Sequence, residues 1–198
     1  MEIVHVISLQ RREDRIVSIV KESKRQGFPL QFFEGIDEPE RKGTAKAICM
    51  AHKNVVRYAA QNNLTSIIVA EDDLFFYGND NKAFQYFLDN TPDDYDLYMG
   101  CIYNGEVNEE NRVLNGMSGS HTLLKIHSRF YDFILNEVPD NCNQDRYLGQ
   151  FAWKFKYYVC LLIVCGQIAG YTDNLKQKHN GYEPYLENRK VYGRDAIQ

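Results

Sequence analysis

The sequence predicts a single α/β domain over residues 1–198, in which a largely parallel central sheet is flanked by helices. Short apolar runs rich in β-branched residues alternate along the chain with segments of helical period, as in parallel sheets with crossover helices. The composition is that of an ordinary globular domain, 44% hydrophobic and 25% charged. No internal repeat, low-complexity tract or clear interdomain linker divides the chain. These observations exclude coiled-coil, collagen-like and disordered classes.

The first half of the chain follows this plan closely. Gly27 stands where a helix C-cap belongs, and Thr44 stands where a helix begins. A charged segment with Pro and Gly, 37–43, predicts a loop. The elements expected here are strands at 3–9, 30–33 and 66–70 and helices at 13–26 and 44–63.

The second half is less regular. We expect Asp80 to cap a short helix, a strand at 95–99, and a hairpin that turns at Asn115-Gly116. Further on, the pattern predicts strands at 121–126 and 156–165, a helix from Ser128 to 136 and a helix from Asn143 to 151. The last residues, 171–198, form a polar, Tyr-rich tail that could close over a site, pack on a partner subunit or lie on the surface.

Charge and cysteine content exclude several functions. With 27 acidic and 23 basic residues the net charge is -4, which argues against a nucleic-acid partner. The five cysteines include no C-x-x-C pair, so neither a zinc finger nor a disulfide framework is predicted, and the thiols fit a cytoplasmic protein. The N-terminus lacks signal-peptide features, and the most apolar run, 157–165, is shorter than the ~20 residues of a transmembrane helix.

The most informative feature is the acidic triplet Glu71-Asp72-Asp73, directly after an apolar strand. Ligands of open α/β sheets bind beyond the carboxyl ends of the strands. Alternation would turn Glu71 and Asp73 to one side and Asp72 to the other. Such carboxylates suit a hard divalent ion, Mn²⁺ or Mg²⁺, that completes its shell with water and phosphate oxygens. The alternative is a solvated acidic loop.

Arginines follow the first strand at the same predicted edge of the sheet. Arg11, Arg12 and Arg15 offer the bidentate geometry that phosphates take. The alternative is that Arg12 and Arg15 form surface pairs with Glu13 and Asp14. The chain has no G-x-G-x-x-G, no P-loop and no G-x-S-x-G, which argues against a dinucleotide oxidoreductase, a P-loop kinase and an α/β-hydrolase.

Several segments together resemble glycosyltransferase family 25, which includes lipooligosaccharide galactosyltransferases. They are VISLQRREDR, FFEGID, AHKNVVRYAAQNN and SIIVAEDD, with weaker matches at HTLLKIHSR, NQDRYLG and GQIAGYTDN. The resemblance implies a GT-A-like fold with a nucleotide-sugar-binding half at about 1–100 and an acceptor half at about 101–170. It also implies an inverting transfer of galactose or glucose from a UDP-sugar to a glycan or glycolipid.

The resemblance also assigns roles to residues. Donor-binding positions match Arg11, Arg15, Asp37, His52, Asp72 and Gln167, and metal-binding positions match Glu71 and Asp73, with His179 as a third ligand. The chain departs from the family pattern at Glu38, at Ala51 and in TAKAI, so subfamily and donor stay open. His52 has a second interpretation, because it lies on an apolar helix face where a core histidine is ordinary.

An inverting transfer needs a carboxylate that deprotonates the acceptor hydroxyl, placed on the far side of the sugar from the diphosphate. Asp145 is the first candidate and Asp173 the second. Asp145 is also explained as a helix-start acid that the macrodipole stabilises. Two other functions remain: a catalytically degenerate binding module of the same fold, and a metal-dependent phosphohydrolase or nucleotidyltransferase. A glycolipid acceptor would place the protein at the inner face of the membrane, while its oligomeric state stays open.

Overall fold

The computed structural model describes residues 2–40, 43–118, 121–172, 177–179 and 191–193. Its centre is a six-stranded sheet in the order β2-β1-β3-β8-β5-β9. The strands pair in parallel except β8, which runs antiparallel to both β3 and β5. This confirms the predicted fold class. The strands are β1 (Val4–Ser8), β2 (Leu30–Glu34), β3 (Ser66–Glu71), β5 (Leu97–Met99), β8 (Leu123–His127) and β9 (Tyr157–Val159).

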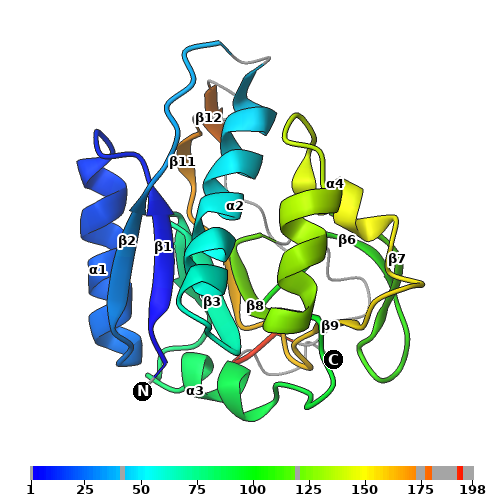
Figure 1. Cartoon of the computed structure of the whole chain (residues 1–198). Coiled ribbons are helices and arrows are strands. Elements are labelled where there is room, and N and C mark those ends of the chain that lie inside the picture. The colour runs from blue at the N-terminus through cyan, green and yellow to red at the C-terminus, as the bar shows by residue number, and fades with distance from the viewer. Residues whose placement is uncertain (1, 41–42, 119–120, 173–176, 180–190, 194–198) are drawn as a thin grey trace.

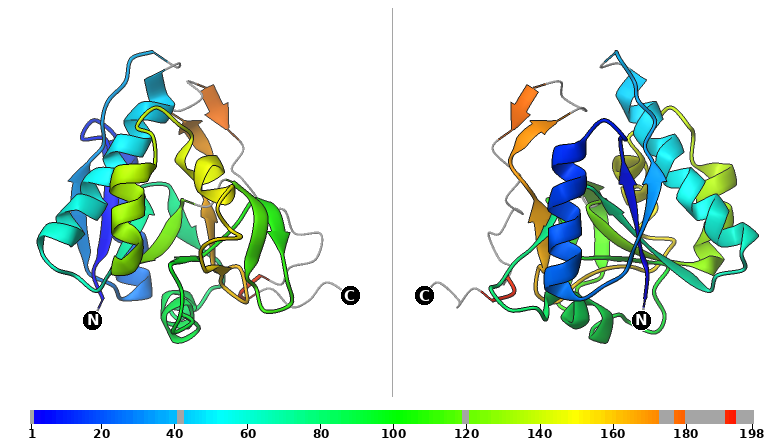
Figure 2. Two further views of the ribbon diagram at one scale, coloured as in Figure 1. Left: turned by 45° about the vertical axis from the view of Figure 1, so that its right-hand side comes forward. Right: turned by 90° about the vertical axis from the view of Figure 1, so that its left-hand side faces the viewer.

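Two long helices cover opposite faces of the first three strands, as the edge-on view in Figure 2 shows. They are α1 (Glu13–Gln26) and α2 (Thr44–Gln61). Gly27 ends α1 in the left-handed conformation, with φ of 75°, and its amide donates to the carbonyl of Ser23 at 2.8 Å. The shorter helices are α3 (Ala83–Asp89), the 3₁₀ turn η2 (Ser128–Phe130), the π-helix η3 (Phe133–Glu137) and α4 (Gln144–Gly149). None of the helices in the described ranges is both long and apolar enough to cross a membrane.

Three small two-stranded sheets complete the fold around the C-terminal part of the chain (Figure 1). Each is antiparallel, and together they place the second half of the chain beside the ends of the central strands. The pairs are β4 (Leu74–Phe76) with β10 (Cys165–Gln167), β6 (Asn104–Val107) with β7 (Val113–Ser118), and β11 (Gly170–Thr172) with β12 (Gln177–His179).

The predicted hairpin turn is wrong in its position. The chain turns at 108–112, where the Asn108 side chain accepts hydrogen bonds from two backbone amides and Asn111 has a positive φ of 60°. Asn115-Gly116 lies inside β7 instead, at a register shift between β6 and β7, and Gly116 has φ of 63°. Glycine at positive φ serves a β-bulge as well as a turn, so the dipeptide alone did not locate the turn.

The strand expected at 156–165 is also wrong, because it divides between two sheets. β9 ends at Val159 on the edge of the central sheet, and β10 begins at Cys165 against β4. The linking residues are apolar because most of them enter the core: Cys160, Ile163 and Val164 are fully buried. A continuous run of apolar residues therefore predicted one strand, although the run is apolar because it is buried and it forms two short strands.

Three expected helix caps differ from the structure. Gly43 precedes α2 at the cap position, and Thr44 is the first helical residue. Lys82 holds the cap position of α3, although Asp80 accepts a bond from its amide at 3.3 Å. The helix expected from Ser128 to 136 is present as one continuous helical segment over 128–137 that includes η2 and η3, but its cap is His127, whose imidazole accepts from the amide of Arg129 at 3.2 Å.

A piece of the tail packs on the body of the protein. Val191 is buried and pairs with Ile163. The hydroxyl of Tyr192 donates to Asp80 at 3.1 Å, and its ring packs against Tyr86. These contacts show that 191–193 do not hang free on the surface.

Candidate functional site

The acidic triplet lies where the carboxyl ends of β1 and β3 meet. Glu71 is the last residue of β3 and pairs in register with Ile7 of β1. The next residue of β1, Ser8, donates its hydroxyl to Asp72 at 2.7 Å. The parallel pairing thus brings a hydroxyl from one strand end to a carboxylate at the next.

Glu71 and Asp73 share a different partner, Gln167, as the alternation of side chains along an extended backbone predicts. The amide nitrogen of Gln167 lies 2.8 Å from an oxygen of Glu71 and 3.3 Å from an oxygen of Asp73. The backbone of Ile168 holds the same segment, because its amide donates to the carbonyl of Asp73 at 2.8 Å. The carboxylates of Glu71 and Asp73 therefore converge on the side chain of Gln167, the last residue of β10.

Arg15 is the cation of this site and comes from the first turn of α1. Its guanidinium is 6% exposed and lies 2.7 Å from Asp73 and 3.5 Å from Asp72. It also donates to the carbonyl of Tyr171 at 3.0 Å, which ties β11 to the site. The surface pairing of Arg15 with Glu13 or Asp14 is therefore wrong: its partners are two carboxylates of the triplet.

The neighbouring arginines lie differently. Arg12 pairs with Asp14 at 2.8 Å, as its alternative interpretation predicts, and also donates to the carbonyl of Tyr171 at 3.2 Å. Arg11 makes a two-point contact with Asp37, at 2.8 and 2.9 Å, and both side chains are about half exposed. The structure thus brings Arg11 and Asp37, both candidates for donor binding, to each other.

Carboxylate charge exceeds cationic charge at this edge. Burial, followed by the charge of Glu71, raises the pKa of Asp73 to about 7. Burial likewise raises the pKa of Asp72 against the opposing bond from Ser8. Burial also acts to raise the pKa of Glu71. The interactions with His52, His121 and Gln167 have the larger combined effect, so the pKa of Glu71 is lowered. Burial at this edge therefore opposes the ionisation of Asp72 and Asp73.

Two stacked histidines lie behind Glu71. His52 on α2 and His121, just before β8, have ring centroids 4.7 Å apart, and both are buried. The Nε2 atom of His52 is 3.5 Å from Glu71, without the alignment of a hydrogen bond. Burial lowers the pKa of His121 to about 4. His52 thus combines its two interpretations, since it is buried on the apolar face of α2 and also faces the triplet.

His121 and Gln144 are buried polar residues that the sequence analysis did not select. Within the described part of the chain, Nε2 of His52, Nε2 of His121 and Oε1 of Gln144 are buried without a hydrogen-bond partner. Buried polar atoms normally find partners, so such atoms often mark a place for water or ligand. In the sequence, the only sign of a role was that a polar residue lies beside the end of a strand or helix, and this pattern is too common to be specific.

Asp145 lies in the first turn of α4, and one of its oxygens accepts the amide of Arg146 at 2.7 Å. Its charge opposes the effect of burial on the pKa of His121. Gly149 at the other end of α4 packs directly on β7, because a Cβ there would lie 2.7 Å from the carbonyl oxygen of Met117. Close packing thus fixes the helix that presents Asp145.

The remaining candidates lie at the edge of what the structure describes. Asp173 lies outside the described residues. His179 is the last residue of β12, where its backbone pairs with Gly170. Across the described ranges, no three His, Cys, Asp or Glu side chains gather closely enough to hold a metal by themselves. Glu71 and Asp73 still fit an ion that takes one or two carboxylates and completes its shell with phosphate and water.

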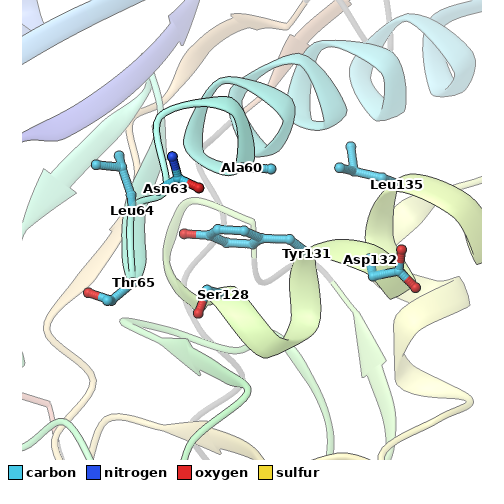
Figure 3. Close-up of a pocket in the computed structure, with 8 residues that line it drawn as sticks. All are labelled: Ala60, Asn63, Leu64, Thr65, Ser128, Tyr131, Asp132 and Leu135. Carbon is cyan, nitrogen blue, oxygen red and sulfur yellow. The ribbon is translucent and has the colours of Figure 1, made fainter.

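A separate cavity of about 420 Å³ lies at the opposite end of β3 (Figure 3). Its wall includes Thr65, which precedes the strand, whereas the carboxylates follow the strand. The cavity is therefore distinct from the acidic site. Its lining residues are Ala60, Asn63, Leu64, Thr65, Ser128, Tyr131, Asp132 and Leu135.

Comparisons with known proteins bear on the fold. No family model matches the chain, and no curated protein matches its sequence. The chain superimposes on the crystal structure of A197 from STIV with a TM-score of 0.51 and 10% identity, over 92% of this chain and 95% of that one. That likeness shows a shared fold.

Two further solved structures give lower scores. One is a glycosyltransferase involved in the glycosylation of the major capsid of PBCV-1, with a TM-score of 0.49 and 13% identity over 80% of this chain and 81% of that one. The other is HddC from Yersinia pseudotuberculosis, with a TM-score of 0.46 and 12% identity over 85% and 73%. At TM-scores below 0.5, neither superposition carries an argument about this chain.

Proposed function

We propose that the protein is a metal-dependent glycosyltransferase that moves a hexose from a UDP-sugar to a glycan or glycolipid acceptor. The observation that carries the proposal is the convergence of Glu71 and Asp73 at the carboxyl end of β3, where Arg15 is a buried cationic partner of Asp73. The resemblance of the sequence to glycosyltransferase family 25, and through it to a GT-A fold, supports the same function.

Departure of a nucleoside diphosphate leaves negative charge on its phosphates. A divalent ion, Mn²⁺ or Mg²⁺, supplies Lewis-acid stabilisation of that charge when it is bound. Glu71 and Asp73 would hold the ion, and Gln167 orients both carboxylates by its amide. Arg15 opposes the effect of burial on the pKa of Asp72 and Asp73, and Ser8 donates its hydroxyl to Asp72.

Asp145 would take the proton from the acceptor hydroxyl. Asp145 belongs to α4, whereas Glu71 ends β3 and the other two carboxylates follow that strand, so the two groups come from different elements. The effect of its charge on the pKa of His121 supports a place on the histidine side of the site. An inverting transfer has this requirement, because base and leaving group act on opposite faces of the sugar. Asp173 and His179 remain second candidates as base and metal ligand.

Turnover tests the enzyme directly. With UDP-galactose or UDP-glucose and Mn²⁺, we expect UDP release by the wild type even without acceptor, since transferases leak to water. Asp145→Asn should lower the rate by about 10²–10⁴-fold, the usual contribution of a general base. Asp89→Asn is the matched control, because Asp89 is an exposed acid at the end of α3. Equal rates for wild type and Asp145→Asn would exclude this residue as the base.

One observation favours a second candidate, a binding module of the same fold without turnover. Arg15 already contacts Asp72, Asp73 and the carbonyl of Tyr171, so its guanidinium is not directed at a phosphate in this conformation. The module predicts UDP-sugar binding with no sugar product from any acceptor and no UDP release above a protein-free control. The transferase predicts release that depends on Mn²⁺.

A further inference from the structure

A pair of thiols outside the carboxylate site joins α2 to the start of α4. Cys49 lies on α2, and Cys142 lies two residues before Gln144, the first residue of α4. Both thiols donate to the same acceptor, the carbonyl oxygen of Pro139, at 3.4 Å from Cys49 and 3.1 Å from Cys142. Two sulfurs from distant parts of the chain are thus held around one carbonyl oxygen.

The surrounding structure keeps the pair together. Lys53, one turn after Cys49, is buried and donates to the carbonyl of Val138 at 2.5 Å and to the carboxylate of Asp140 at 2.6 Å. These bonds fix the 138–142 segment on α2. Holding two groups in place raises their effective concentration for each other, which favours an intramolecular bond over a mixed one.

The two thiols differ in access, and this defines their roles. Cys49 is fully buried, whereas Cys142 is partly exposed. A reagent can therefore reach Cys142 first, and Cys49 can act only on what Cys142 has become. Attacking and resolving cysteines of redox couples have this relation.

We propose that Cys49 and Cys142 are a redox couple that closes to a reversible disulfide between α2 and the segment leading into α4. The oxidant is a small-molecule disulfide such as oxidised glutathione. Cys142, as thiolate, attacks one sulfur and releases one glutathione thiolate, which takes up a proton. Cys49 then loses its proton, attacks the Cys142 sulfur and releases the second glutathione. Two protein thiols are oxidised and one glutathione disulfide is reduced to two thiols.

The disulfide would restrain the two helices that flank the histidine pair. Cys49 is three residues before His52 on α2, and Cys142 is three residues before Asp145. Oxidation therefore links the segment that carries His52 to the segment that carries Asp145. The restraint itself does not depend on the proposed transferase activity.

The chain contains its own control. Cys101 and Cys165 are a second pair of interacting thiols, but both are fully buried in the core. The same reagent should leave this second pair reduced, because neither sulfur is accessible to attack. A difference in cross-linking between the two pairs therefore reports both the access of the reagent and the geometry of the thiols.

The test exposes the full chain to millimolar oxidised glutathione, blocks remaining thiols with a maleimide and maps the peptides by mass spectrometry. We expect a Cys49–Cys142 cross-link in most molecules, reversed by reduced dithiothreitol, with Cys101 and Cys165 alkylated after unfolding. Cys49→Ser should stop at a glutathione adduct on Cys142, and Cys142→Ser should give neither adduct nor cross-link.

Three outcomes would overturn the proposal. The first is a stable glutathione adduct on Cys142 in the wild type with no cross-link. The second is no reaction at Cys142. The third is equal cross-linking of Cys101 with Cys165. Because Ser replaces Cys at nearly equal size, a thermal melt of each variant shows whether it is folded, and labelling of Cys142 in folded Cys49→Ser keeps the test decisive.

Discussion

The two halves of the molecule contribute different things to the candidate site. Residues 4–99 form the two long helices and the three parallel strands β1, β2 and β3, and they supply the charged groups of the site from strand ends and the first turn of a helix. Residues 100–172 form short strands in several sheets, and they supply neutral groups and one acid that approach those charges. The first set is Ser8, Arg15, His52 and Glu71 to Asp73; the second is His121, Gln144, Asp145, Gln167 and the carbonyl of Tyr171.

This difference teaches how such a site is built. Repelling carboxylates need rigid supports, and the ends of paired strands provide them. Groups that touch a substrate can come from irregular segments, provided that close packing fixes each one. We therefore expect variants in the two halves to change the free energy of unfolding by different amounts and for different physical reasons.

The largest expected effect is that of Arg15→Met in the first half. Removing the buried guanidinium leaves Asp72 and Asp73 without their cation, and breaking a buried pair costs about 3–5 kcal/mol. Arg11→Met is the matched control, because its pair with Asp37 is exposed and contributes less than about 1 kcal/mol. Urea unfolding measures both. Equal losses would show that Arg15 does not stabilise the triplet.

A smaller effect is expected from Gly149→Ala in the second half. Ala is normally the better helix former, so an open site would gain about 1 kcal/mol. Here the new Cβ would meet the backbone oxygen and nitrogen of Met117 at 2.7 and 2.8 Å, so we expect a loss of about 1–3 kcal/mol. Thermal unfolding gives the sign. Gln150→Ala, on the exposed neighbour, should change stability by less than about 0.5 kcal/mol.

The smallest effect concerns pH and His5, a buried histidine of the first half that has a partner. Its Nδ1 lies 3.0 Å from the carbonyl oxygen of Ile68, and burial lowers its pKa below 6.5. Below pH 6.5 the unfolded chain binds a proton that folded His5 still refuses, so stability falls as the pH is lowered. In His5→Gln the fall between pH 6.5 and 5 should be shallower. An unchanged slope would mean that His5 is protonated in the folded protein.

Much of the first half was predictable because one rule governs each element there. The bounds of α1 and its Gly27 cap follow from helical period and the left-handed preference of glycine. In the second half, the same local sequence pattern is compatible with more than one structure. Asn115-Gly116 suits a bulge as well as a turn, and the apolar run 156–165 is buried for two sheets rather than one.

The site divides in the same way. The triplet and Arg15 were predictable, because parallel strands place their carboxyl ends at one edge. The pairing of Arg11 with Asp37, and the contact between His52 and His121, depend on loop paths that no local pattern specifies. The partners of Gln167 likewise depend on β10 crossing to β4, which follows from tertiary packing alone.

The most direct test of the central claim is calorimetric titration of UDP into the wild type, with Mn²⁺ and with EDTA, and into Asp73→Asn. The account predicts binding that requires Mn²⁺ and weakens at least about tenfold in Asp73→Asn, or about 1.4 kcal/mol, while Asp89→Asn binds like the wild type. UDP binding of equal strength with EDTA and in Asp73→Asn would contradict a metal-dependent nucleotide site at the end of β3.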